Sequence, residues 1–96
     1  MGWSCTRAVG QTLDSLSERC RALTGSSNTW EVDGQSYFWE LDSEEHDDCS
    51  ATGQVMKMLP GGRCQVVSSF RIDPDGRIVR GLGAFHGIGD ANRRAA

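Results

Sequence analysis

Residues 29–41 read TWEVDGQSYFWEL, and this stretch decides how the chain folds. Two runs in which apolar and polar residues alternate, 29–32 and 35–41, lie on either side of Asp33-Gly34. Asp-Gly favours the type I′ turn of a tight hairpin, in which both central residues take positive φ. Such a turn sets the pairs of residues that stand opposite one another: Val32 with Gln35, Glu31 with Ser36, and Trp30 with Tyr37.

Alternation gives this hairpin two unlike faces, because successive side chains of a strand point to opposite sides. We expect the aromatic face to lie in the core: Trp30, Val32, Tyr37, Trp39 and Leu41. Phe38 stands on the other face, among polar neighbours. Aromatic residues on a sheet beneath a helix are typical of a core rather than of a ligand pocket.

Before the hairpin, residues 4–23 are predicted to form a helix. Their apolar positions step by three or four residues along one helical face: Cys5, Val9, Leu13, Leu16, Cys20 and Leu23. Ser4 is suited to cap the first turn, and Gly25 is suited to the left-handed position that ends a helix.

After the hairpin the pattern predicts three more strands, at about 52–59, 64–72 and 77–80. Turn residues 60–62 and 73–76 separate them, and a glycine-rich arm occupies 81–96. The 96 residues suffice for one domain, 1–96. The predicted fold class is α+β, with the N-terminal helix packed on a four- to five-stranded antiparallel meander.

One helix can cover only one face of a sheet, so the second face needs an explanation. Apolar residues expected there are Phe38, Met56 or Met58, Val67 and Val79. Either the arm at 82–88 or a second subunit should cover them. The register of strand 52–59 stays open, because its apolar residues would serve both faces.

Charge divides the chain into unlike halves. Residues 1–50 carry three basic and ten acidic side chains, whereas residues 51–96 carry seven basic and three acidic ones, for a net charge of −3. Local ion pairs, or pairing between copies, would follow from this division. The overall acidity argues against nucleic acid as a partner, although the C-terminal-half arginines leave weak binding open.

The four cysteines are expected to be reduced. Cys5 and Cys20 would lie about 22 Å apart on one helix, too far to bridge each other. A bond between Cys49 and Cys64 remains possible. No apolar run is long enough to cross a membrane, and residues 1–15 lack the features of a secretory signal, so the expected location is the cytoplasm.

His46 stands in the densest group of potential metal ligands, beside Glu45, Asp47 and Asp48. The spacing matches no known cation loop and favours a solvated acidic connection. His86, the other histidine, has neither a nearby nucleophile in the sequence nor an acid to orient it. We therefore expect no cofactor.

The sequence best supports a non-catalytic binding or assembly module that acts through a sheet face or edge. Its partner would be a second copy of the chain, as a homodimer, or another protein. The alternative is a small-ligand or metal-assisted enzyme that uses His46 and its acidic neighbours, or His86. Weak nucleic-acid binding through the arginines is a third possibility.

Overall fold

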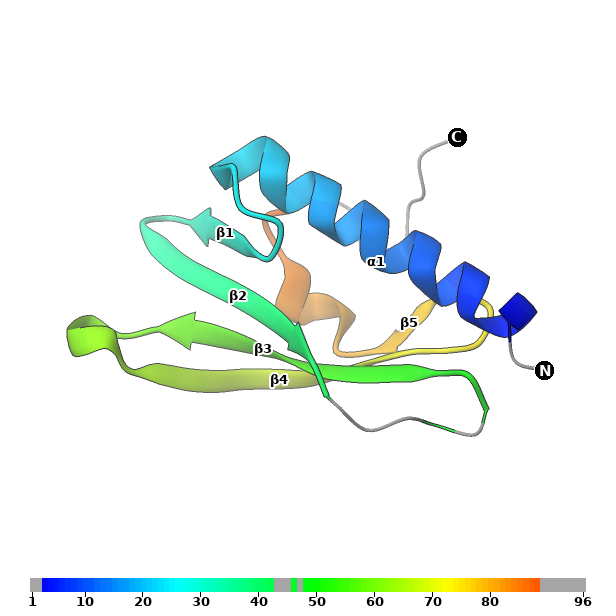
Figure 1. The fold of residues 1–96 in the computed structure, drawn as a ribbon. Helices are drawn as coiled ribbons and strands as arrows, with labels where there is room; N and C mark the ends of the chain where they lie inside the picture. The colour runs from blue at the N-terminus through cyan, green and yellow to red at the C-terminus, as the bar shows by residue number, and fades with distance from the viewer. Residues whose placement is uncertain (1–2, 43–45, 47, 89–96) are drawn as a thin grey trace.

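The computed structural model describes residues 3–42, 46 and 48–88, with residues 3–6 described by their backbone alone. Its elements, in chain order, are helix α1 (Trp3–Thr24), strands β1 (Thr29–Val32), β2 (Gln35–Leu41) and β3 (Ala51–Met58), the short 3₁₀ helix η1 (Pro60–Gly62), strands β4 (Cys64–Ile72) and β5 (Ile78–Arg80), and the 3₁₀ helix η2 (Leu82–Phe85). The strands form one antiparallel meander in the order β1-β2-β3-β4-β5. Figure 1 shows α1 lying across one side of this sheet, which confirms the predicted α+β fold.

The hairpin that opens the sheet has the predicted turn and register. Asp33 and Gly34 both take positive φ, at 51° and 80°. All three predicted pairs stand opposite one another: Val32 with Gln35, Glu31 with Ser36, and Trp30 with Tyr37. Two residues of turn chemistry therefore suffice to set the alignment of β1 and β2.

Helix α1 ends as its sequence suggests. Gly25 takes φ of 81°, and its N–H donates to the carbonyl of Arg21 at 2.9 Å. That bond satisfies one of the carbonyls that a helix end leaves without a partner. The buried side chains Val9, Leu16 and Cys20 mark the face of α1 that packs on the sheet.

A β-bulge sets the register between β3 and β4. Val55 stands opposite Ser68, whereas Met56 stands opposite Val66, so Val67 is the extra residue. The alternation of β4 is therefore out of phase on the two sides of Val67. As a result Val66, rather than Val67, shares a side of the sheet with Met56.

The turn between β4 and β5 is held by one carboxylate. Asp73 Oδ1 accepts the backbone N–H groups of Asp75, at 3.0 Å, and of Arg77, at 2.9 Å. The carbonyl of Gly76 accepts a hydrogen bond from the hydroxyl of Thr12 in α1. Thr12 is 1% exposed and is the one fully buried polar residue in the described part of the chain.

Residues 82–88 do not cover the second face of the sheet, which corrects one of the two alternatives left open by the sequence. Phe85 stacks on Trp30, with ring centroids 5.8 Å apart, and meets the edge of Phe70 at 5.1 Å. Arg19 Nη1 donates to the carbonyl of Ile88 at 3.3 Å, which ties the arm to α1. The arm takes this place because Phe85 and Ile88 fill the space that α1 leaves above the sheet.

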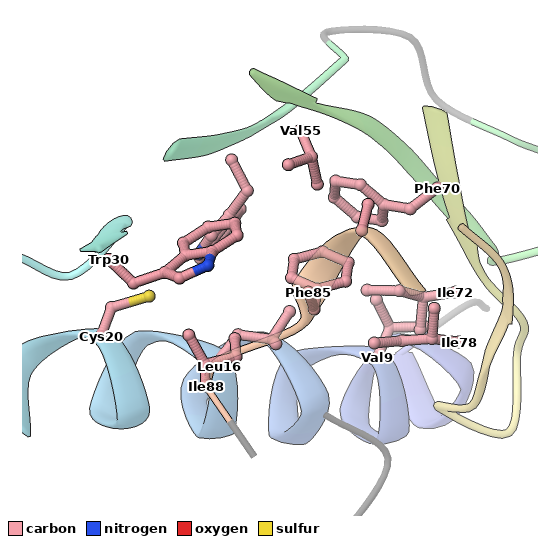
Figure 2. Close-up of a cluster of buried hydrophobic side chains, with 12 residues drawn as sticks. Val9, Leu16, Cys20, Trp30, Val55, Phe70, Ile72, Ile78, Phe85 and Ile88 are labelled. Atoms are coloured by element: carbon pink, nitrogen blue, oxygen red, sulfur yellow. The ribbon is translucent and has the colours of Figure 1, made fainter. Parts of the chain in front are cut away.

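One apolar core lies between α1, the sheet and the arm (Figure 2). Its buried members come from all three layers: Val9, Leu16, Cys20, Trp30, Trp39, Val55, Phe70, Ile72, Ile78, Ala84, Phe85 and Ile88. Trp30 and Trp39 are thus core residues, as predicted, whereas Leu41, which was expected on the same face, is 42% exposed.

The Cys20 thiol makes the stability of this core dependent on pH. Burial raises the pKa of the Cys20 thiol, and the neighbouring Trp39 side chain opposes the rise in part. An unfolded thiol titrates near about pH 8.5, so above that pH the unfolded chain loses a proton that the folded chain keeps. The free energy of unfolding should be flat below about pH 8.5 and should fall as the pH rises further toward the folded pKa of Cys20.

Urea denaturation at pH 7, 8.5 and 9.5 measures this effect. Cys20→Ala should remove the decrease between pH 8.5 and 9.5, whatever it costs at pH 7. The exposed Cys64 provides the control, because Cys64→Ala should leave the decrease in place. An equal decrease in both variants would show that another group is responsible.

Candidate functional site

The face of the sheet that points away from α1 carries a row of apolar side chains. Register places Phe38 opposite Met56, and Met56 opposite Val66, on three adjacent strands. Val66 is 50% exposed, whereas Phe38 and Met56 are half-buried. In Figure 1, α1 and η2 lie on the same side of the sheet, and no described element covers the other. We call this face the outer face.

Strand β4 has an open edge over the part that β5 does not reach. β5 pairs only with Arg71 and Ile72, so residues 64–69 pair with β3 alone. Gly81 lies against the carbonyl of Ser69, which closes the edge at that point. Residues 64–67 are exposed and Ser68 is half-buried. We call residues 64–68 the open edge of β4.

The open edge lacks the features that usually prevent strand edges from pairing. Its sequence, CQVVS, contains no charged residue and no proline. Natural edge strands are commonly shielded by lysine, proline, an irregular backbone or a covering segment. Here the bulge at Val67 is the one such feature in the described structure.

Strand β1, at the other side of the sheet, is bordered by its own chain. Thr24 Oγ1 donates to the carbonyl of Thr29 at 3.0 Å. Trp30 Nε1 donates to the carbonyl of His86 at 3.0 Å, and Gly87 packs directly against Val32. β1 and the open edge of β4 therefore differ, because α1 and the arm pack beside β1.

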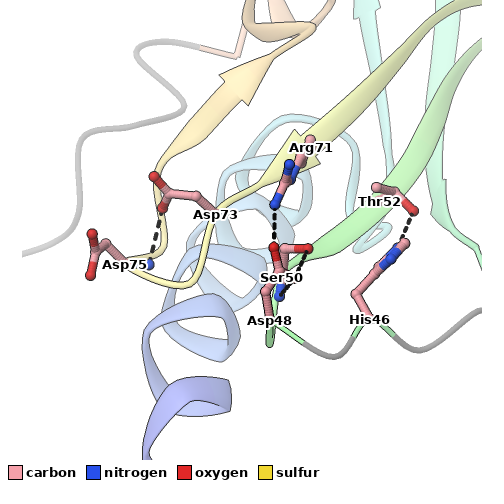
Figure 3. Close-up of polar contacts among 7 residues, drawn as sticks. All are labelled: His46, Asp48, Ser50, Thr52, Arg71, Asp73 and Asp75. Atoms are coloured by element: carbon pink, nitrogen blue, oxygen red, sulfur yellow. Dashed lines mark hydrogen bonds and ion pairs between the residues drawn. The ribbon is translucent and has the colours of Figure 1, made fainter.

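A shallow, open depression of about 390 Å³ lies where β3 begins and β4 ends. It is lined by His46, Asp48, Ser50, Thr52, Arg71 and Arg80. Asp48 Oδ2 pairs with Arg71 at 2.5 Å (Figure 3). Hydrogen bonds from the Ser50 hydroxyl, at 2.6 Å, and from its N–H, at 3.1 Å, lower the pKa of Asp48, and Arg71 adds a smaller effect.

Within the described residues, His46 takes part in a chain of hydrogen bonds with Thr52 and Asp42. The hydroxyl of Thr52 donates to Asp42 Oδ2 at 2.8 Å, because a carboxylate only accepts. His46 Nε2, at 2.9 Å from the same hydroxyl oxygen, must then be the donor. A general base would have to accept the hydroxyl proton instead, so this geometry is not that of a catalytic pair.

The other predicted ligands do not gather around either histidine. Glu45 and Asp47 lie outside the described residues. Within the part of the chain that is described, no three histidine, cysteine, aspartate or glutamate side chains are placed to hold a metal ion. His86 lies against the ring of Tyr37, with centroids 5.4 Å apart, in a contact between the arm and β2.

The expectation that all cysteines are reduced is wrong for Cys49, which is disulfide-bonded. Cys20 and Cys64 are free, so the possible bond between Cys49 and Cys64 is not formed. The reason is structural: Cys64 begins β4 beside η1, whereas Cys49 precedes β3 in a turn with φ of 66°. Because β3 and β4 are antiparallel, Met58 stands opposite Cys64, and Cys49 lies beyond the far end of β3.

Among the described residues, Arg63 does not share a basic surface with Arg71 and Arg80. Arg71 and Arg80 are register partners at the depression, and Arg71 is paired with Asp48. Arg63 lies at the opposite end of β4, about 26 Å away at roughly 3.3 Å per residue. Phe70, the nearest aromatic residue, is buried on the other face, so no stacking platform accompanies these charges.

The sequence indicated a second face and an unspecified sheet edge, but the edge was not assigned to β4. The signal was present in the lengths of the predicted strands, since 64–72 is more than twice as long as 77–80. An antiparallel partner that short cannot pair along the whole of its neighbour.

Of the helices in the described ranges, none is long and apolar enough to cross a membrane. No protein-family model matches the chain, and no curated protein or solved structure shows significant similarity to it. What the chain can do is therefore inferred from its own surface.

Proposed function

We propose that the chain is a non-catalytic binding module that receives an extended strand of another polypeptide along the open edge of β4. The observation that carries the proposal is the uncharged stretch 64–68, which is exposed at residues 64–67 and pairs with β3 on one side only. Its outward N–H and C=O groups are a template for a further strand, and strand addition at a sheet edge is a recurring mode of peptide recognition.

The outer face favours an apolar partner strand. Val66 lies on the edge itself, and Met56 and Phe38 continue the apolar row inward. Alternate side chains of an added strand would lie beside Val66, so small or β-branched apolar residues fit best. The nearest charge on the strand, Arg71, is already paired with Asp48.

The competing functions have less support. An enzyme built on His46 lacks a contact that would activate a nucleophile, and His86 serves the packing of the arm. The separated arginines also give little support to nucleic-acid binding. A cytoplasmic location is weakened by the disulfide at Cys49, because such bonds persist mainly in oxidising compartments.

The proposal is tested with the strand that the chain itself provides. A fluorescent peptide of residues 63–70, with Cys64→Ser, should bind the full chain saturably in an anisotropy titration. Hydrogen exchange of the complex should show new protection at the amides of residues 64–68, because added pairing bonds protect edge amides.

A control peptide with Val66→Pro and Ser68→Pro should not bind, since proline cannot donate to a ladder. Absence of saturable binding by the unmodified peptide, or protection confined to other strands, would contradict the proposal.

A further inference from the structure

We infer that the strand received at the open edge is β4 of a second copy, paired antiparallel about a two-fold axis so that one sheet runs through both copies. This inference rests on the proposed function and adds the identity of the partner. Three features carry it: the available edges, the length and charge of the stretch, and the position of the apolar row.

On the side of the sheet away from β1, the described part has two stretches without a further strand: residues 64–68 of β4 and the outer side of the three-residue strand β5. β1 is bordered by α1 and the arm, through the Thr24 to Thr29 and Trp30 to His86 hydrogen bonds. A contact between unlike edges would generate open chains of copies, but it needs two free edges. β5 offers only three residues for such a contact, whereas two copies of the longer β4 stretch can pair through the same edge, which gives a closed, two-fold dimer.

The open edge fits a copy of itself in length and charge. It is bounded by η1 at one end and by Gly81, against Ser69, at the other. Antiparallel pairing centred on Val66 and Val67 would bring Arg63 of one copy opposite residues 69–70 of the other, which are uncharged. No like charges therefore face each other across the axis.

The apolar row of the outer face would continue from one copy into the other. Val66 of each copy would lie next to the axis, followed inward by Met56 and Phe38. The bulge at Val67 adds local twist, and two-stranded antiparallel contacts accommodate large twist. Because both copies carry the same bulge, their edges twist alike.

Introducing a charge at Val67 tests this arrangement, because the side chain is 44% exposed and does not belong to the core cluster. Val67→Lys and Val67→Glu each place two like charges beside the axis. Light scattering over a dilution series should show a dimer for the unaltered chain and, for each variant, a dissociation constant raised about a hundredfold. An equimolar mixture of the two variants should form the dimer again, and more weakly at high salt.

Leu23→Lys is the matched control, because Leu23 is 55% exposed but lies on α1, so this variant should dimerise like the unaltered chain. The Lys and Glu pair at Val66 provides a second test should circular dichroism show that a Val67 variant does not fold. A strictly monomeric chain that still binds the 63–70 peptide would overturn this inference and leave the proposed function standing. If the chain neither dimerises nor binds the 63–70 peptide, both this inference and the proposed function are wrong. The inference would also be overturned if all the Lys and Glu variants still dimerised, or if the mixture of Lys and Glu variants stayed monomeric.

Discussion

Replacing Phe85 with alanine should lower the free energy of unfolding by about 3–5 kcal/mol. Phe85 is 1% exposed and packs against both Trp30 and Phe70, so its removal leaves a cavity between the arm and the sheet. A domain of this size has a total stability of only about 5–15 kcal/mol. Urea denaturation followed by tryptophan fluorescence should show a large shift of the midpoint, because Trp30 lies in the same cluster.

Leu82, in the same 3₁₀ helix as Phe85, provides the control for the loss of stability in Phe85→Ala. It is 40% exposed, so Leu82→Ala should cost less than about 1 kcal/mol. Similar effects of the two substitutions would mean that the arm does not belong to the core.

Gly81→Ala should destabilise the fold by about 2–5 kcal/mol. Gly81 has φ of 78°, which costs an alanine about 1–2 kcal/mol. Its Cβ would also collide with the carbonyl oxygen of Ser69 and come within 2.9 Å of the Cα of Phe70. Both contacts are backbone atoms of a central strand, and overpacking of this kind adds about 1–3 kcal/mol.

Gly61→Ala separates the two contributions. Gly61 has nearly the same φ, 81°, but a Cβ there would meet no atom within 4 Å. Its substitution should cost about 1 kcal/mol, from backbone conformation alone. Thermal or urea denaturation of both variants gives the difference, and equal losses would exclude a close approach of Gly81 to β4.

Local chemistry made the first half of the fold predictable. The Asp33-Gly34 turn has few conformations open to it, so the pairing of β1 with β2 followed from two residues. Helix α1 was equally accessible, because its stripe, and the glycine that ends it, lie within one continuous segment. In both cases each interaction joins residues that are close in the sequence.

The second half depended on contacts that no local pattern records. The bulge at Val67 was hidden because apolar residues on both faces of β3 are compatible with more than one register. Phe85 entered the core from a glycine-rich arm without periodicity. The disulfide state of Cys49 likewise depends on tertiary placement rather than on spacing.

The candidate site was predicted only in outline. Phe38 and Met56 do stand side by side on the uncovered face, but the open edge of β4 follows from where β5 stops. Gly81 lies against β4 at Ser69, and the sequence alone does not indicate this approach. Edges of a sheet are therefore harder to predict than its faces, which alternation marks directly.

The hydrogen bond between Thr12 and Gly76 determines where α1 sits on the sheet. Apolar contacts alone do not fix the position of a helix on a sheet, because a leucine that shifts along an apolar surface exchanges one set of neighbours for a similar one. The Thr12 hydroxyl is more restricted: away from Gly76 it would keep only the longer contact, 3.3 Å, with the carbonyl of Ala8 in its own helix. A buried polar group left without a good partner costs about 1–3 kcal/mol. A rotation or a one-residue slip of the helix would break the contact with Gly76, so this buried hydroxyl fixes the position of α1 relative to the turn between β4 and β5.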